Sequence, residues 1–198
     1  RLPLLLVSMI IYLNMFPCFI LMFIGKGRRG KVYGLLNFAI KIGRKESKAI
    51  NFIGNEAKWL RILNKHGIGP KLYFHGKNYI IFEFVRGEGI LDFFKQASKK
   101  EKLGVIKGVF RQCRTLDKMN VDKLEMHHPA KHIIVGKKVV MLDFEKCRSS
   151  LKPKNVTQFA QFLPRLIDVE RSKFRKALAD YKKCYSKKDY ERILSLIS

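Results

Sequence analysis

Short apolar runs of strand length recur through the first half of the chain, separated by residues typical of turns. They predict strands over residues 19–24, 32–36, 38–42, 70–74 and 79–85. Between the third and fourth runs, residues 47–65 follow a helical period instead. The apolar face of this predicted helix holds Ala49, Ile53, Leu60 and Leu63, with Gly67 just beyond its end. The pattern therefore predicts a sheet and one helix in this half.

The second half of the chain follows helical periods. Residues 101–120 predict a long helix whose apolar face holds Val105, Ile106, Val109, Phe110, Cys113, Leu116 and Met119. Shorter helices are predicted over 90–96, 157–167, 171–181 and 188–197. A hairpin is predicted over 132–135 and 139–142, turning at Gly136-Lys137. With 198 residues, the chain suits one domain of the α+β class.

Two local motifs give this pattern a candidate chemistry. The stretch Gly25-Lys26-Gly27-Arg28-Arg29-Gly30-Lys31-Val32 has the spacing G-x-G-x-x-G-x-V, which by itself recurs by chance. A few residues later, Phe38-Ala39-Ile40-Lys41 reads like the V-A-I-K strand of protein kinases. With both stretches in this order, the chain resembles the protein-kinase superfamily.

The resemblance implies a two-lobed α+β fold. Its N-lobe would be a five-stranded antiparallel sheet with helix αC, at about 19–86, and its small, mostly helical C-lobe would lie at about 87–198. Residues 1–18 would form a separate apolar segment. Asp143-Phe144-Glu145 stands at the D-F-G position, and no Ala-Pro-Glu motif follows it. This shortened plan resembles the small atypical kinases of the RIO and Kae1-associated kinds and the archaeal predicted serine/threonine kinases.

Glu56 lies on the apolar face of its predicted helix, where a carboxylate needs a partner. Kinases pair a glutamate of helix αC with the lysine of the third strand, so the resemblance implies a Glu56–Lys41 ion pair. It also implies ATP as the nucleotide and Asp143 as a ligand of Mg²⁺ or Mn²⁺. The cofactor-binding residues that it implies are Ile24, Gly25, Gly27, Gly30, Val32, Ala39, Lys41, Glu83 and Val85, the last two in the hinge.

The expected catalytic loop departs from the kinase pattern. Kinases carry H-R-D or H-G-D followed by a metal-binding asparagine, but no His-x-Asp occurs in residues 121–132. His132 falls near the asparagine position, where it would suit Mn²⁺ better than Mg²⁺. A carboxylate is the better group to accept a hydroxyl proton. Glu125 is therefore the first candidate base, Asp122 the second and His127 the third.

Glu145 replaces the glycine of D-F-G. Asp-x-Glu endings also occur in kinase-like phosphotransferases that act on small molecules, such as aminoglycoside and choline kinases. Glu145 is expected to be either a second carboxylate facing the metal or a surface residue beside Lys146. A zinc site of His127, His128 and His132 would lack a fourth ligand nearby.

The charge of the chain is strongly positive. Its 41 Lys and Arg residues against 16 Asp and Glu give a formal net charge of +25. Such an excess favours an anionic partner, unless it only reflects a lysine-rich source composition. Besides ATP, we expect a protein acceptor or an RNA- or ribosome-associated substrate. The cysteines, Cys18, Cys113, Cys147 and Cys184, form no Cys-x-x-Cys pair, which suits a reducing, cytoplasmic location.

The N-terminal residues 2–24 are nearly all apolar and are followed by a basic stretch. This pattern is typical of a membrane span with the rest of the chain on the cytoplasmic side. The glycine-rich loop, however, needs residues 19–24 as its strand. The remainder, 2–18, is interrupted by Pro3, Asn14 and Pro17 and is short for a span. A single-pass anchor and a non-native extension both stay open.

Three functions remain open from the sequence. The first is an ATP-dependent serine/threonine protein kinase, and the second is a small-molecule kinase of the aminoglycoside- and choline-kinase group. The third is a pseudokinase that binds nucleotide without transferring phosphate. The presence of Lys41, Glu56 and Asp143 favours the first two, whereas the missing His-x-Asp favours the third.

Overall fold

The computed structural model describes residues 21–27, 29–44 and 47–197, with 47–50 described by their backbone alone. The predicted apolar segment 2–18 and the first residues of the predicted strand 19–24 lie outside these ranges. No helix within the described ranges has both the length and the apolar composition that crossing a membrane requires.

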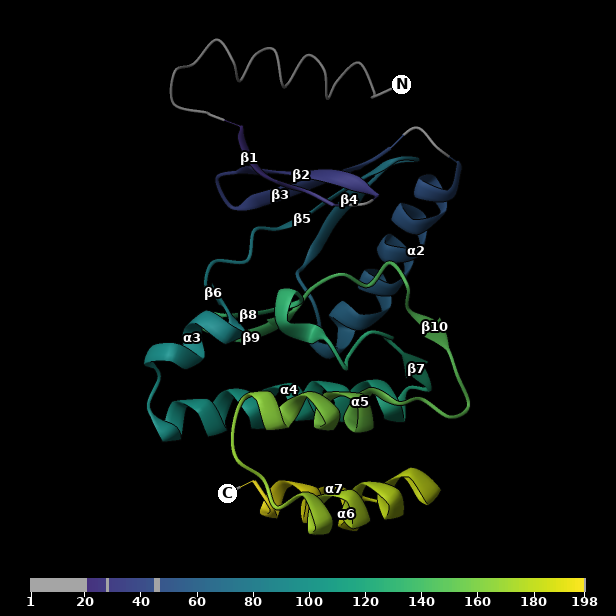
Figure 1. The fold of residues 1–198 in the computed structure, drawn as a ribbon. Helices are drawn as coiled ribbons and strands as arrows, with labels where there is room; N and C mark the ends of the chain where they lie inside the picture. Colours follow the sequence, from purple (N-terminus) through teal and green to yellow (C-terminus); the bar gives the residue numbers. More distant parts are fainter. Residues whose placement is uncertain (1–20, 28, 45–46, 198) are drawn as a thin grey trace.

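A five-stranded antiparallel sheet forms one end of the molecule (Figure 1). Its strands are β1 (Met22–Lys26), β2 (Gly30–Leu35), β3 (Phe38–Gly43), β4 (Leu72–His75) and β5 (Tyr79–Glu83), in the order β1-β2-β3-β5-β4. The predicted antiparallel sheet is thus confirmed. Strand β5 ends earlier than predicted because the chain turns away after Phe84, whose backbone N–H donates to the carbonyl of Asn37 at 2.8 Å.

Helix α2 (Ser47–Leu63) packs beside this sheet (Figure 1). Its buried side chains include Ile53, Leu60 and Leu63, at the spacing that the sequence predicts. A 3₁₀ turn, Asn64–His66, follows the helix and ends at Gly67. Gly67 has a φ of 67°, a left-handed conformation that glycine adopts without the steric cost of a Cβ. The helix therefore ends where its apolar period ends.

Five helices make up most of the other end of the described chain. They are α3 (Ile90–Gln96), α4 (Lys99–Lys118), α5 (Asn155–Phe162), α6 (Arg171–Cys184) and α7 (Lys187–Ser195). Helix α4 begins before the predicted residue 101 because Ser98 caps it. The Ser98 side chain accepts a hydrogen bond from the Glu101 N–H at 3.3 Å, and the Glu101 carboxylate accepts one from the Ser98 N–H at 2.8 Å.

The prediction of one helix over 157–167 is wrong at its C-terminal end. Helix α5 ends at Phe162, and a 3₁₀ turn, Leu163–Arg165, follows. Pro164 explains the break, because proline has no N–H and its ring crowds the preceding turn. The helix also begins two residues early, because the Asp117 carboxylate accepts hydrogen bonds from the Asn155 and Val156 N–H groups at 3.0 and 3.3 Å.

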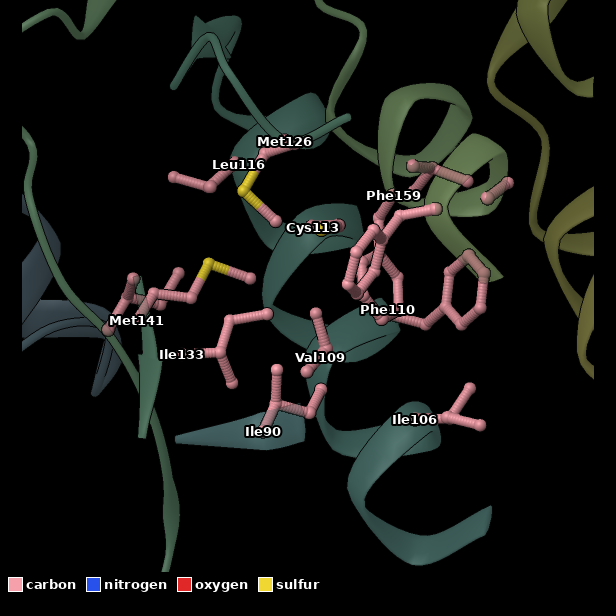
Figure 2. Close-up of a cluster of buried hydrophobic side chains, with 14 of the residues drawn as sticks. Ile90, Ile106, Val109, Phe110, Cys113, Leu116, Met126, Ile133, Met141 and Phe159 are labelled. Carbon is pink, nitrogen blue, oxygen red and sulfur yellow. The ribbon is translucent and has the colours of Figure 1, made fainter. Parts of the chain in front are cut away.

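The main core surrounds helix α4 (Figure 2). The rings of Phe110 on α4 and Phe159 on α5 meet edge to face with 4.9 Å between centroids. Ile133 and Met141 pack against the same helix from the predicted hairpin. Full burial of each such side chain contributes about 1.5–3 kcal/mol. The core thereby fixes the hairpin to α4.

Three small pairings position the loops between these elements. The hairpin forms as β8 (Ile133–Val135) and β9 (Val139–Met141), which confirms its prediction. Two-residue strands add to it: β6 (Glu88–Gly89) pairs with β8, and β7 (Val121–Asp122) pairs with β10 (Arg148–Ser149). Runs of two residues carry no periodic signal in a sequence. The β7–β10 pairing brings the loop after β7 beside the segment after β9.

A buried polar network joins α4, α5 and α6 beneath that loop. The Asp117 carboxylate accepts hydrogen bonds from the Asn155 side-chain amide at 2.8 Å and from the Tyr181 hydroxyl at 2.9 Å. Asn155 in turn donates to the Val121 carbonyl at 2.6 Å and accepts from the Lys123 N–H at 2.9 Å. Because Asn155 contacts both Asp117 and the loop, the network fixes where the loop leaves β7.

Candidate active site

Lys41 on β3 reaches Glu56 on α2. Its Nζ atom lies 2.6 Å from Oε2 of Glu56, which is the pairing that the sequence predicts. Glu56 is 3% exposed, so its carboxylate has left water almost completely. Burial raises the pKa of Glu56, and the Lys41 ammonium opposes that shift. The pair therefore ties α2 to the sheet through a charge that neither residue could bury alone.

Two further carboxylates converge on Lys41. Its Nζ lies 3.1 Å from Oε2 of Glu145 and 3.7 Å from Oδ1 of Asp143. Burial by itself would lower the pKa of Lys41, but Glu56, Asp143 and Glu145 together raise it well above its ordinary value. Lys41 is therefore a permanent cation at the centre of the site.

Asp143 follows β9 with an unusual backbone conformation. Its φ is 62°, in the left-handed region that non-glycine residues seldom occupy. One carboxylate oxygen, Oδ2, lies 3.6 Å from Nδ1 of His132. The other, Oδ1, is buried and has no hydrogen-bond partner among the described residues. Burial would raise the pKa of Asp143, but Lys41, Lys123 and His132 lower it, so the group is an anion.

Glu145 is buried, at 7% exposure, and is therefore not the surface residue that was one of its two expected roles. Its carboxylate is ion-paired with Arg29 of the glycine-rich turn as well as with Lys41. The Asn55 side chain of α2 donates to the Glu145 carbonyl at 2.8 Å. Sequence reasoning missed the Arg29 and Asn55 contacts. Neither residue has a motif that distinguishes it from its neighbours.

Within the described ranges, one group of acidic, histidine or cysteine residues is close enough to hold a metal ion. It consists of Glu56, Asp143 and Glu145, whose nearest ligand atoms all lie within 4.8 Å of one another. Within those ranges, His127, His128 and His132 are not part of this group. The rings of His127 and His128 lie beside each other instead, with centroids 4.6 Å apart.

Lys123 is a second buried lysine that sequence reasoning missed. Its Nζ donates to the Asp143 carbonyl at 3.0 Å and lies over the Phe144 ring at 5.1 Å from the centroid. Burial lowers the pKa of Lys123, against the attraction of nearby groups that include Asp143. Lys123 thus ties the loop after β7 to the segment after β9. One lysine among many gives no sequence signal.

The candidate bases lie at the end of β7 and in the loop that follows it. Leu124 and Glu125 have φ values of 62° and 56°. Like Asp143, they therefore adopt the left-handed conformation, which is strained for residues other than glycine. Glu125 is exposed and ion-paired with Lys146, which lowers the pKa of its carboxylate. Asp122, in contrast, is 2% exposed, and its carboxylate accepts a long hydrogen bond from the Leu124 N–H at 3.4 Å. His127 is exposed two residues beyond Glu125.

The residues expected to cover a nucleotide meet on one face of the sheet. The register places Val32 directly across from Lys41, and Gly34 directly across from Ala39. A Cβ built on Gly34 would lie 3.1 Å from the Ile24 side chain, so Ile24 shares this face. Opposite residues of an antiparallel pair project to the same side. Ile24, Val32, Ala39 and Lys41 are therefore brought together.

The glycine-rich turn between β1 and β2 contains glycines with two different requirements. At Gly30 a Cβ would collide with the carbonyl oxygen of Ile42, so the sheet itself requires glycine there. At Gly25 a Cβ would meet nothing within 4 Å, and at Gly27 only the Gly30 oxygen at 3.8 Å. Packing within the described chain therefore does not require glycine at positions 25 and 27.

The expected hinge follows β5. The Glu83 N–H donates to the carbonyl of Lys71, just before β4, at 2.8 Å. This N–H is therefore already paired within the chain. Val85 lies outside the strand and is half-buried. Its backbone N–H donates to no acceptor in the described part of the chain. The structure thus leaves a main-chain donor at Val85 that a ligand could use.

Comparison with known proteins shows the fold. No family model and no curated protein sequence matches the chain. Among solved structures, the co-crystal structure of WbdD with the kinase inhibitor LY294002 is similar, with a TM-score of 0.66 and 16% sequence identity. The match covers 88% of this chain and 44% of the WbdD chain, so this chain spans less than half of that protein. At this identity the likeness shows a kinase-like fold.

Proposed function

We propose that the chain is an ATP-dependent phosphotransferase and, within that class, a serine/threonine protein kinase of the minimal atypical type. The observation that carries the proposal is the position of Lys41. It bridges Glu56 of α2 and Asp143 after β9, 2.6 and 3.7 Å away. Phosphoryl transfer requires mainly positioning and charge stabilisation, and a lysine held in this way supplies both to phosphate groups.

The implied fold has two lobes, and we infer that they meet after β5. The sheet and α2 would belong to the N-lobe, at about 19–86, and the remaining helices to the C-lobe, at about 87–198. Gly87 supports a fixed crossing there. Its φ is 149°, and a Cβ would collide with the carbonyl of Val135 on β8. A residue with a Cβ would therefore not fit at position 87, where the connection between the lobes passes β8.

The residues present fit a divalent cation. Mg²⁺ is usually held by one or two carboxylates together with substrate phosphates. The buried Oδ1 of Asp143 has no hydrogen-bond partner among the described residues, so it is the oxygen best suited to such an ion. Glu145 is a second candidate ligand. His132 would join only with an ion that tolerates nitrogen, such as Mn²⁺. The ion would neutralise charge on the phosphates.

The chain's own residues have separate tasks in this proposal. Lys41 binds the phosphates, and the turn at Gly25 and Gly27 lets its backbone approach them. The Val85 N–H binds the adenine, beside the Glu83 carbonyl. Glu125 orients the acceptor hydroxyl and accepts its proton, because it is the exposed carboxylate of the strained loop. For the buried Asp122 we propose a role in shaping the loop.

A nucleotide-binding module without transfer activity is the second candidate. One observation favours it: Lys146 is ion-paired with Glu125 and lowers the pKa of that carboxylate, which makes it a weaker base. An acceptor that displaces Lys146 would remove this obstacle. Measuring transfer therefore separates the two candidates.

The proposal is tested by transfer of labelled γ-phosphate from ATP to a mixed protein acceptor, with Mg²⁺ and then with Mn²⁺. We expect transfer by the unmodified chain and a loss of about 100-fold in Glu125→Gln, the usual range for a general base. ATP binding should be unchanged in that variant. Glu191→Gln on α7 is the matched control and should transfer normally. ATP binding without transfer in any sample would instead establish the second candidate.

The glycines give a prediction that separates ligand binding from folding. Gly25→Ala and Gly27→Ala should leave the thermal unfolding midpoint nearly unchanged, because the added methyl meets no described atom at Gly25 and makes only an ordinary contact at Gly27. Both should weaken ATP binding if the backbone must approach the phosphates. Gly30→Ala should lower the midpoint, because its methyl collides with the Ile42 carbonyl. Calorimetry of ATP binding and thermal unfolding measure the two effects. Unchanged ATP affinity in the first two variants would contradict the assignment.

A further inference from the structure

A groove of about 1110 Å³ lies on the helical end of the molecule. Helices α5 and α6 and the turn that follows α5 form most of its walls. Its lining runs from Lys154, just before α5, to Lys182 on α6, and includes His127 of the loop after β7. The groove is separate from the cluster around Lys41, because it shares no residue with that cluster.

Five cations line this groove without a compensating anion. They are Lys154, Arg165, Arg171, Arg175 and Lys182, all exposed, and no carboxylate is among the lining residues. None of the five forms an ion pair with a described carboxylate. Two other lysines of α6 do have partners: Lys173 pairs with Glu170 at 2.8 Å and Lys183 with Asp180 at 3.1 Å. The groove therefore holds five positive charges that no described carboxylate neutralises.

One end of the groove reaches the candidate catalytic loop. His127 lines the groove and lies two residues from Glu125. Gln158 also lines it, and its Oε1 accepts a hydrogen bond from the N–H of Met126 at 3.2 Å. A chain lying in the groove would thus continue towards Glu125.

The lining suits a peptide better than a nucleic acid. Val169 and Leu178 are half-buried and give the groove apolar surface between its cations, and Gln161 offers both a donor and an acceptor for a peptide backbone. Proteins that bind single-stranded nucleic acid usually add exposed aromatic rings on which bases stack. Phe174 is the only Phe, Tyr or Trp residue in this lining, and it is only 4% exposed, so bases could not stack on its ring.

We infer that this groove binds an acidic segment of the protein acceptor. The acidic residues of that segment lie beside the serine or threonine whose hydroxyl proton Glu125 accepts. The inference rests on the proposed function and deepens it by specifying the substrate class. Complementary charge would both speed the encounter and set the register of the segment. The binding itself requires neither ATP nor phosphate transfer, so it is measured separately from activity.

The test is fluorescence anisotropy, at physiological salt and without ATP. The probe is a short labelled peptide with one serine among glutamates, compared with the same peptide carrying glutamines. We expect the acidic peptide alone to bind, and Arg171→Glu combined with Arg175→Glu to weaken it at least about tenfold. The matched control, Lys173→Glu combined with Lys183→Glu, has the same net charge and lies on the same helix. It should weaken binding less than about twofold, since exposed charges outside the site are screened.

Three outcomes would overturn the inference. They are no binding of the acidic peptide to the unmodified chain, an equal loss in both double variants, and tighter binding of a single-stranded RNA of equal charge through Arg171 and Arg175. Thermal unfolding checks that each variant is folded. If the glutamate pair unfolds the chain, Arg171→Gln combined with Arg175→Gln repeats the test without reversing charge. Selective binding with no transfer of phosphate would leave this inference standing and the proposed kinase activity refuted.

Discussion

Replacing Lys41 with alanine is expected to slow phosphate transfer by about 10²- to 10³-fold or more, while the chain still folds. The reason is that Lys41 is the buried cation on which Glu56, Asp143 and Glu145 converge. Among the described residues, Lys41 alone is ion-paired with both Glu56 and Asp143, so the charge that develops on the phosphates would lose its main protein partner. Initial rates of γ-phosphate transfer measure the effect. The matched control is Lys31→Ala on the neighbouring strand, whose exposed side chain lies outside the site.

The same variant should also be less stable, for a reason that can be tested. Without Lys41, burial raises the pKa of Glu56 further, because its opposing charge is gone. An acid whose folded-state pKa is raised is protonated in the folded chain but ionised in the unfolded chain. The stability of Lys41→Ala should therefore fall as pH rises above the ordinary glutamate pKa. Adding Glu56→Gln to Lys41→Ala should restore the stability, whereas the rate of phosphate transfer should stay low. If the double variant transfers phosphate normally, Lys41 has no role in catalysis.

Replacing Asp117 with alanine is expected to destabilise the chain by about 3 kcal/mol or more, because each buried donor left without an acceptor costs about 1–3 kcal/mol. The substitution would leave the Asn155 amide and the Tyr181 hydroxyl without their acceptor. It would also leave the first N–H groups of α5 unpaired. Burial outweighs these hydrogen bonds and raises the pKa of Asp117, so its carboxylate depends on every one of them. Chemical denaturation followed by circular dichroism measures the loss.

Two controls show whether the network or the mere loss of a carboxylate is responsible. Tyr181→Phe removes one hydroxyl of the network and should cost about 1 kcal/mol. Asp92→Ala removes an exposed carboxylate that pairs only with Lys95, so it should leave the denaturation midpoint unchanged. An Asp117→Ala midpoint equal to that of Asp92→Ala would show that the network does not stabilise the fold.

The sequence predicted the features that depend on local spacing. Strand and helix periods place the sheet, α2 and α4 correctly, because an apolar face must be buried wherever the period produces one. Glu56 needs a partner because it interrupts such a face, and the resemblance to kinases implied that this partner is Lys41. The end of α5 shows a local rule that was available and not applied, since Pro164 stands inside the predicted helix.

Other parts of the site could not be predicted because their partners are distant in sequence and have no pattern. The sequence allows two roles for Glu145, and its burial beside Lys41 and Arg29 excludes the surface role. Lys123 resembles any other lysine until the β7–β10 pairing turns its loop toward Asp143. Pairings of two residues are too short to give a periodic signal.

By itself, the sequence determined the order of the longer strands and helices, the excess of positive charge and the residue types that a phosphate site requires. These follow from spacing and composition, which each stretch carries regardless of its neighbours. Only the tertiary structure decided that Asp117 holds the loop through Asn155, and that five cations share one groove while Lys173 and Lys183 of α6 are paired. Those arrangements depend on which surfaces pack together, because packing brings distant side chains within contact distance and removes them from water.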